Sequence, residues 1–223
     1  DFANGNGINS SSEYDLYCHY VAGLVGQGLT RLFVHYEYLA PHPNLDHLAN
    51  EMGLFLQKTN IIRDVHEDWQ QGRCFWPQSP AHLAHCLAQP QSAAAQATLD
   101  DMLNDAWRHW PSCLQFLHLL HDRAPQGVFE FCAVPQVMAM ATLQLVQQTS
   151  GSVWQQTLKI RKGLAARIVQ SSSTIEQVEA WAQRLHPKSP KKSIASQSTD
   201  LSKDTFKYDI RNTRKGTPPN FKR

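Results

Sequence analysis

Most of the chain shows apolar residues recurring every three or four positions, interrupted by short stretches that contain glycine or proline. This period of about 3.6 predicts amphipathic helices, and no stretch has the strict alternation of a half-buried strand. The sequence therefore predicts an all-α fold. Its expected helices span residues 14–33, 45–70, 91–121, 126–148, 152–170 and 174–185.

Glycine and proline refine this pattern at three places. Gly23, Gly26 and Gly28 lie inside the first expected helix, where they would allow another helix to pack closely. Their spacing is not a dinucleotide fingerprint, because no strand precedes them. Gly72 begins a loop after the second helix, and Pro135 should kink the helix at 126–148 because it lacks a backbone donor.

The composition predicts three regions. Residues 14–186 are expected to form one helical domain, preceded by a disordered lead-in at 1–13. Residues 187–223 contain ten Lys or Arg against three Asp and few apolar residues, so we expect a basic, disordered tail. The formal net charge of +2 comes from this tail, so it gives no argument for nucleic-acid binding by the folded part.

Compartment signals are few. No run of 18 or more apolar residues predicts a membrane span, and no signal peptide is recognisable. The five cysteines are scattered and odd in number, which favours reduced thiols facing the cytosol.

The helix at 45–70 carries the most informative pattern. At 100° per residue, five polar side chains fall within an arc of about 100°, and apolar residues flank the arc on both sides. Burying such a stripe is costly unless a cation compensates its charge. Carboxylates at this spacing suit Mg²⁺, a hard ion that prefers oxygen ligands. The five residues are Gln57, Asn60, Asp64, Glu67 and Asp68.

Two arginines strengthen this interpretation. Arg63 lies at the edge of the arc and Arg73 follows in the next turn, so guanidinium groups would stand beside the carboxylates. That combination suits a metal–diphosphate site, but a solvated acidic helix face explains the spacing about equally well. Asp100, Asp101 and Asp105 also place carboxylates at helical spacing, and we interpret them as a solvated face.

Five segments, one of which includes part of the polar arc, together resemble the squalene synthase family. They occur along the chain in the same order as in that family. The similarity extends over about residues 14–186. The segments are YCHYVAGLVG at 17–26, GLFLQKTNIIRD at 53–64, FWPQ at 75–78, FEFCAVPQ at 129–136 and KIRKG at 159–163.

The resemblance implies an all-α isoprenoid synthase bundle. Members of this family couple two farnesyl diphosphates head to head to presqualene diphosphate, then use NADPH to produce squalene for sterol biosynthesis. They hold Mg²⁺ between two aspartate-rich motifs. The resemblance also implies an enzyme on the cytosolic face of the endoplasmic reticulum membrane, and we expect a monomer that binds no nucleic acid.

Individual roles follow from matching positions. Asp64, Glu67 and Asp68 match the second aspartate-rich motif and are the expected metal ligands. Tyr17 matches the tyrosine of the first half-reaction. The remaining expectations are Phe129 and Phe131 as catalytic residues that shield a carbocation, Asn60, Lys159 and Arg161 for the cofactor, and Gln57, Arg63 and Arg73 for substrate diphosphate.

The chain also departs from the family pattern. The first aspartate-rich motif should lie well before Tyr17, and the family's C-terminal hydrophobic anchor is not present, so we expect a fragment of a longer protein. Two alternatives stay open: a phytoene or dehydrosqualene synthase, which condenses without the final reduction, and a non-catalytic relative that binds diphosphate.

Overall fold

The structure is a computed structural model that describes residues 8, 10–149 and 151–186, and within these residues every regular element is helical. The all-α prediction is therefore confirmed. The expected tail at 187–223 and most of the lead-in at 1–13 lie outside the described residues. The elements are α1 (Ser11–Cys18), the π-helix η1 (His19–Gly23), α2 (Leu24–His35), α3 (Leu45–Arg63), α4 (Val65–Gln70), α5 (Pro80–Ala88), α6 (Ala93–Trp107), α7 (Trp110–His121), α8 (Gln126–Gln148), the 3₁₀ turn η2 (Ser152–Trp154), α9 (Lys162–Gln170) and α10 (Ile175–Leu185).

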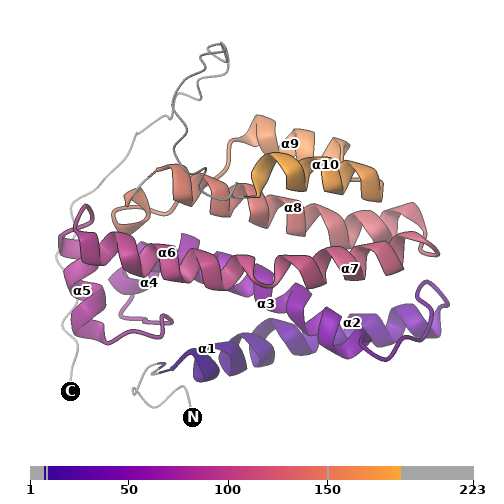
Figure 1. Ribbon diagram of the computed structural model, residues 1–223, viewed down its shortest axis with the longest axis horizontal. Coiled ribbons are helices and arrows are strands. Elements are labelled where there is room, and N and C mark those ends of the chain that lie inside the picture. Colours follow the sequence, from indigo (N-terminus) through magenta and orange to yellow (C-terminus); the bar gives the residue numbers. More distant parts are fainter. Residues whose placement is uncertain (1–7, 9, 150, 187–223) are drawn as a thin grey trace, which may run out of the picture.

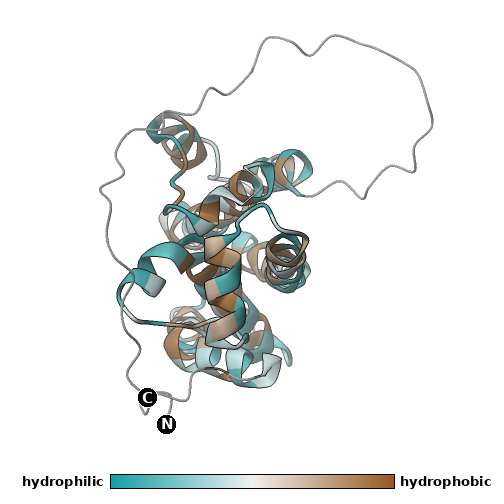
Figure 2. Ribbon diagram, turned by 90° about the vertical axis from the view of Figure 1, so that its left-hand side faces the viewer, coloured by the Kyte–Doolittle hydropathy of each residue, from teal (hydrophilic) through white to brown (hydrophobic). Residues whose placement is uncertain are grey.

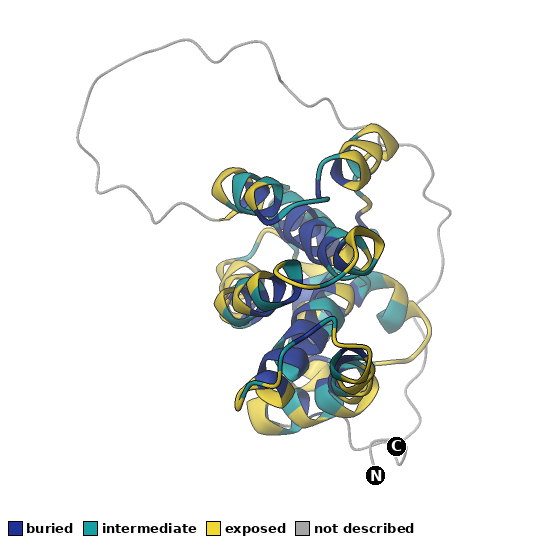
Figure 3. Cartoon of the chain, turned by 90° about the vertical axis from the view of Figure 1, so that its right-hand side faces the viewer, coloured by how far each residue is buried: buried dark blue, intermediate teal, exposed yellow. Residues whose placement is uncertain are grey.

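Helix α3 is the centre of the bundle. It packs against α1, η1 and α2 on one side and against α6, α7 and α8 on others (Figure 1). Leu48, Phe55 and Ile62 of α3 are at most 2% exposed. Buried residues concentrate along this middle layer, while exposed residues line the outer helices (Figure 3). Seen from the other side, the outer helices carry hydrophilic and hydrophobic residues on different faces (Figure 2).

Serine and threonine caps begin several of the helices. Ser10 accepts a hydrogen bond from the backbone N–H of Glu13 at 3.2 Å, which starts α1 three residues earlier than expected. Ser79, with Pro80 directly after it, caps α5 in the same way. Such side chains satisfy backbone donors that the first turn of a helix leaves unpaired. The Ser79–Pro80 signal identifies α5, a helix that the periodicity did not predict.

Three long helices expected from the pattern are interrupted. The helix at 45–70 ends at Arg63 and resumes at Val65, although the backbone hydrogen bonds Asp64 N to Asn60 O and Asp68 N to Asp64 O continue through the break at 2.9 and 2.8 Å. The helix at 14–33 contains the π-helical turn η1. The helix at 91–121 divides after Trp107, because Pro111 sits in the first turn of α7 and cannot continue a helix already in progress.

The expectation of one helix at 152–170 is wrong. Only the turn η2 and α9 are helical there, and residues 155–161 between them are irregular. Leu158 in this irregular segment is 7% exposed, so its apolar side chain is buried without belonging to a helix. The helices at 126–148 and 174–185 are confirmed almost to the residue.

Helix α8 contains Pro135 and is long and apolar enough, by composition alone, to cross a membrane. Half of its most apolar window is buried in the bundle. The helix packs against α3, α7, α9 and α10, which accounts for the buried part of that window.

Glycines set the distance between α3 and the α1–η1–α2 arm. A Cβ atom on Gly53 would lie 2.6 Å from the backbone carbonyl of Ala22, and one on Gly26 would lie 2.5 Å from the carbonyl oxygen of Ala49. Because real Cβ atoms essentially never come so close, the two helices can approach at this distance only with glycine on both sides. The close packing expected from the sequence is therefore found, and each side of the contact contributes one glycine.

This contact gives a stability prediction. Gly53→Ala should lower the free energy of unfolding by about 1–3 kcal/mol, because the backbone of Ala22 cannot move aside as a flexible side chain would. Urea unfolding measures the change. Gly28→Ala is the matched control: nothing lies within 4 Å of its Cβ position, and alanine in a helix interior should raise stability by about 0.5–1 kcal/mol. Equal effects at both positions would contradict the close approach.

Candidate functional site

The acidic residues expected from the sequence come together where α3 ends and α4 begins. Asp64 occupies the junction, and Glu67 and Asp68 lie in the first turn of α4. Two cavities meet here, because Arg63 and Asp64 line both of them. One, of about 400 Å³, is also lined by Glu67, Thr142, Thr157 and Lys159. The other, of about 230 Å³, is also lined by Gln57, Asn60, Asp68, Arg73 and Phe75.

Each aspartate of the group is paired with an arginine. Arg63 donates from Nε and Nη2 to the two oxygens of Asp64, at 2.8 and 2.5 Å. Arg73 donates to Oδ1 of Asp68 at 2.7 Å. A carboxylate oxygen can accept more than one donor or cation. The arrangement therefore keeps guanidinium groups and carboxylates in the same two cavities.

The charges of the group act on one another. Burial raises the pKa of Asp68, and the neighbouring charges of Asp64 and Glu67 raise it further, while Arg73 opposes both effects. The pKa of Arg63 is raised by its hydrogen bond to Asp64 and by the charges of Asp64, Glu67 and Asp68. Neighbouring like charges favour a bound cation or proton.

Tyr17 reaches the site from α1 through an aromatic contact. Its ring stacks on Phe75, with centroids 5.3 Å apart and planes 17° from parallel. The guanidinium carbon of Arg73 lies 5.9 Å from the centre of the Phe75 ring. Burial raises the pKa of Tyr17, and the charges of Cys18 and Asp68 add to it. Tyr17, Phe75, Arg73 and Asp68 thus form one connected group.

The loop that carries Arg73 and Phe75 is fixed to the core by Trp76. This side chain is 1% exposed. Its indole N–H donates to the backbone carbonyl of Ile61 on α3 at 3.2 Å, and its ring lies 5.1 Å from that of Trp154. The loop is therefore held on α3, the helix that ends at the acidic residues.

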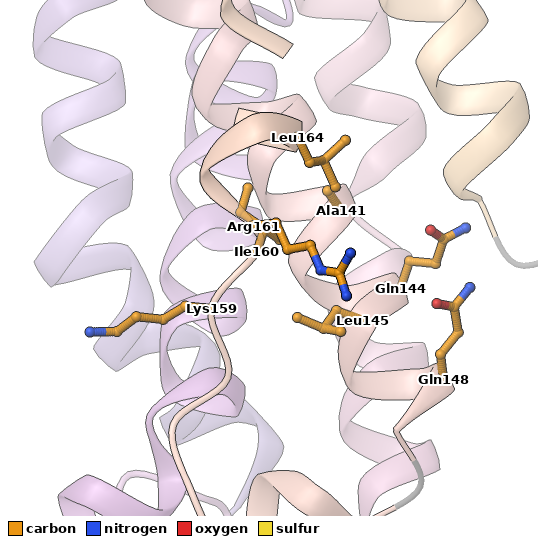
Figure 4. A pocket seen from close by; sticks show the side chains of 8 residues that line it. All are labelled: Ala141, Gln144, Leu145, Gln148, Lys159, Ile160, Arg161 and Leu164. Atoms are coloured by element: carbon orange, nitrogen blue, oxygen red, sulfur yellow. The ribbon is translucent and has the colours of Figure 1, made fainter. Parts of the chain in front are cut away.

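The irregular segment 155–161 forms the opposite wall. Thr157 donates to Glu67 at 3.2 Å, and Lys159 lines the larger cavity with Arg63 and Asp64. Arg161 lines a small neighbouring pocket with Gln144 and Gln148 of α8. The side chains of Lys159 and Arg161 extend to opposite sides of the segment (Figure 4). Only Lys159 of these two expected cofactor residues therefore shares a cavity with the acidic group.

The two phenylalanines expected to shield a cation are separated by the geometry of α8. Phe129 is 1% exposed and meets the ring of His121 edge-on, at 5.0 Å between centroids. Phe131 is 61% exposed. It lines an apolar cavity of about 310 Å³ between α2, α3 and α8, with Val25, Phe33, Met52, Gly53, Leu56 and Cys132 among the other residues.

Sequence reasoning missed two contributors and misjudged a third. Thr157 fell in a stretch wrongly expected to be helical, and Phe75 was part of a family motif but was given no role. Asp105 is not part of a solvated face: it is paired with a buried lysine, Lys58, at 2.5 Å. Asp100 and Asp101 are exposed, as expected. No local signal in the sequence reveals a pairing between residues 47 positions apart.

Comparisons with known proteins show which family this chain resembles. The sequence profile of the squalene/phytoene synthase family matches residues 1–163. A probable squalene synthase of Neurospora crassa is 41% identical over 198 residues, which is 83% of this chain and 40% of that protein. The squalene synthase of Rattus norvegicus is 38% identical over 96% of this chain and 51% of its own length, and that of Homo sapiens is 43% identical over 78% and 42%.

Solved structures agree with the sequence comparisons. A complex of TcSQS with the ligand BPH1237 superposes with a TM-score of 0.73 at 37% identity, covering 87% of this chain and 59% of that one. A complex of TcSQS with E5700 gives a TM-score of 0.70. The expected isoprenoid synthase fold is thereby confirmed. The chain spans about half or less of the length of the sequence relatives described above.

The electrostatics of the site predict a specific titration. Arg73→Gln should raise the pKa of Asp68 further, because it removes the hydrogen bond and the charge that oppose burial. Carboxyl ¹³C NMR against pH measures this directly, with Arg31→Gln as control, since Arg31 pairs only loosely with Asp46 at 3.8 Å in solvent.

The sign of the stability effect follows. Because the pKa of Asp68 is raised in the folded state, its protonated form stabilises the fold at low pH, and this contribution is lost as pH rises through the folded-state pKa. In Arg73→Gln the loss should occur at higher pH. An unchanged or lowered pKa of Asp68 would contradict the assigned pairing.

Proposed function

Because the chain belongs to the squalene/phytoene synthase family, we propose that it supplies the second aspartate-rich half of a squalene synthase active site. The complete enzyme would join two farnesyl diphosphates head to head to presqualene diphosphate and reduce that intermediate to squalene with NADPH. The sections of chain that the relatives have beyond this one would complete the site.

One observation carries the proposal: a single helix face that runs along α3 and on into α4 changes from apolar to polar and acidic along its length. Residues 49, 52, 53 and 56 line the apolar cavity, and residues 60, 63, 64 and 67 line the polar cavities further along. Spacings of three and four keep these positions on one face of a helix. A prenyl diphosphate has the same polarity, with an apolar tail and an anionic head. The face therefore matches that substrate class over its whole length.

The donor set fits Mg²⁺. Asp64, Glu67 and Asp68 offer only oxygen ligands. Burial raises the pKa of Asp68 most, and a divalent ion would relieve the smaller contribution from the charges of Asp64 and Glu67. When bound, the ion would neutralise diphosphate oxygens and so assist departure of the leaving group. Arg63 and Arg73 would contribute in the same direction, because their guanidinium groups can bind phosphate oxygens while remaining beside the carboxylates.

Tyr17 is proposed to act in the first half-reaction. Its phenol is protonated near neutral pH, and burial raises its pKa further, so the hydroxyl can donate a hydrogen bond next to the diphosphate site. Its ring, stacked on Phe75, also offers an aromatic face to a developing cation. Phe131, in the wall of the apolar cavity, would shield the cation of the second half-reaction. Phe129 would instead support this wall from within the core, since its ring is buried against His121.

Lys159, Asn60 and Arg161 are the proposed contacts for NADPH. Lys159 and Asn60 are exposed and line the two cavities beside the acidic group. Their donors fit a phosphate-bearing cofactor, which would supply the hydride that no side chain can donate. Arg161, in the adjoining pocket, would bind a more distant part of the same molecule.

We further propose that the complete protein is a monomer on the cytosolic face of the endoplasmic reticulum membrane.

A chimeric enzyme tests the function. The region of human squalene synthase that matches this chain would be replaced by residues 14–186, and the products from labelled farnesyl diphosphate and Mg²⁺ analysed with and without NADPH. We expect presqualene diphosphate without NADPH and squalene with it. Dehydrosqualene or phytoene-type products that do not depend on NADPH would identify the non-reducing branch of the family. A folded chimera without any product would indicate a non-catalytic, diphosphate-binding relative.

The metal assignment can be tested in the chain itself. Mg²⁺ should raise the thermal unfolding midpoint, because a ligand that binds only the folded state stabilises it. Asp68→Asn should abolish most of this shift, and in the chimera it should lower turnover at least about 100-fold if the metal's transition-state contribution is several kcal/mol. Asp100→Asn, which changes an exposed aspartate outside the site, should keep both. An equal Mg²⁺ shift in all three proteins would remove the assignment.

A further inference from the structure

Helix α1 carries Tyr17 but has little apolar surface to hold it in place. Of its eight residues only Tyr14 and Cys18 are buried, and Leu16 is 43% exposed. Two buried side chains four positions apart define a single contact line along the helix. The packing of η1 and α2 on α3 holds the rest of this arm, and a further interaction anchors α1 itself.

That interaction is an ion-pair network centred on a buried lysine. Lys58 of α3 is fully buried, and its ammonium group lies 2.5 Å from Oδ1 of Asp15 and 2.5 Å from Oδ2 of Asp105. It also lies 4.9 Å from the centre of the Tyr14 ring, over its face. The lysine therefore binds α1 and α6 at once from the middle of α3.

Arg108 closes the network from the solvent side. It donates to Oδ2 of Asp15 at 2.6 Å and to Oδ1 of Asp105 at 2.7 Å. Each aspartate thus uses one oxygen for Lys58 and the other for Arg108, and the four charges sum to zero. Donor atoms of Asp15, Asp105 and His109 lie within 4.8 Å of one another, a grouping that could hold a metal ion. Here two side-chain cations already neutralise the carboxylates.

The energetics favour a role in placement over one in stability. Replacing a complete buried ion pair with apolar residues of similar size is often neutral or stabilising, whereas removing one partner costs about 3–5 kcal/mol. Directional, charged hydrogen bonds do, however, select one arrangement among several of similar packing energy. The lowered pKa of Asp15, which burial alone would raise, reflects how strongly Lys58 and Arg108 hold it.

The helix geometry connects this network to the site. Asp15 and Tyr17 are two residues apart, so their side chains leave α1 about 200° from each other. When Asp15 is bound to Lys58, the opposite side of α1 presents Tyr17 to Phe75. We propose that Lys58, through Asp15, is a positioning residue that sets the register of α1 on α3 and so places Tyr17 at the acidic site. The consequence for catalysis rests on the proposed function, but the placement itself does not.

The test places a fluorine label at Tyr17. 3-Fluorotyrosine is incorporated at position 17 of this chain, and ¹⁹F NMR reports the ring's environment while urea unfolding reports stability. Phe75→Leu provides the shift of a ring without its stacking partner. The key variant is Asp15→Leu/Lys58→Met, which removes the pair and keeps apolar volume. Asp46→Asn is the control, because it removes an exposed pair from the same helix, α3.

We expect the double variant to retain most of the unfolding midpoint while its ¹⁹F resonance moves towards the Phe75→Leu position or splits into several. A resonance unchanged from the unsubstituted chain would overturn the proposal, whatever the stability. If the double variant does not fold, Arg108→Gln is measured instead. The Arg108 side chain is half exposed, and its loss leaves Lys58 in place. It should show part of the same shift, and no shift would also overturn the proposal.

Kinetics of the chimera separate this proposal from the proposed function. Asp15→Leu/Lys58→Met should lower kcat of the first half-reaction by about 10²-fold, the effect of a displacement near 1 Å, with KM changed less than about twofold because the diphosphate site is intact. A purely structural role would instead lower the amount of folded enzyme with kcat per folded molecule unchanged. If the unsubstituted chimera is inactive, the function fails while the ¹⁹F result still decides the placement.

Discussion

The central position of α3 is the constraint on which the rest of the structure depends. Other helices pack against this helix along most of its length, so every charge that it carries inward needs a partner within the bundle. Lys58 finds two aspartates and Glu51 finds His109 at 2.6 Å. Arg63, near the end of the helix, pairs with Asp64. These pairs join α3 to α1, to α6 and to the α6–α7 junction.

The acidic group lies where this constraint relaxes. At Asp64 the central helix ends, and Glu67 is already exposed on α4. Asp68 is in between: it is partly buried, its pKa is raised, and one arginine offsets only part of that cost. The proposed cation site would benefit from this intermediate environment, because full burial would enforce permanent internal pairs and full exposure would screen the charges. The position of the group at the end of α3 thus gives it partial burial without enclosure by the bundle.

The sequence predicted this part of the molecule well because the information is local. Spacings of three and four along one helix placed Gln57, Asn60 and Asp64 around a common cavity, and the break at Asp64 left that arrangement intact because the backbone hydrogen bonds continue through it. The features that escaped prediction depend on distant contacts. The partner of Asp105 is 47 residues away, and the irregular segment around Thr157 is held by side-chain contacts with α4. Periodicity has no access to either kind of contact.

Two opposite faces of α3 have different roles. Phe55, Lys58 and Ile62, at spacings of three and four, form the face that is closed by packing and ion pairs. Gly53 lies on the other face, where its lack of a side chain lets the backbone of Ala22 in η1 approach closely. This face lines the apolar cavity together with Phe131 of α8. A larger residue at position 53 would force the two helices apart. The closed face thereby binds the arm that carries Tyr17, and the open face lines the apolar cavity and, further along, the polar cavities of the acidic group, so the placement of both depends on the same helix.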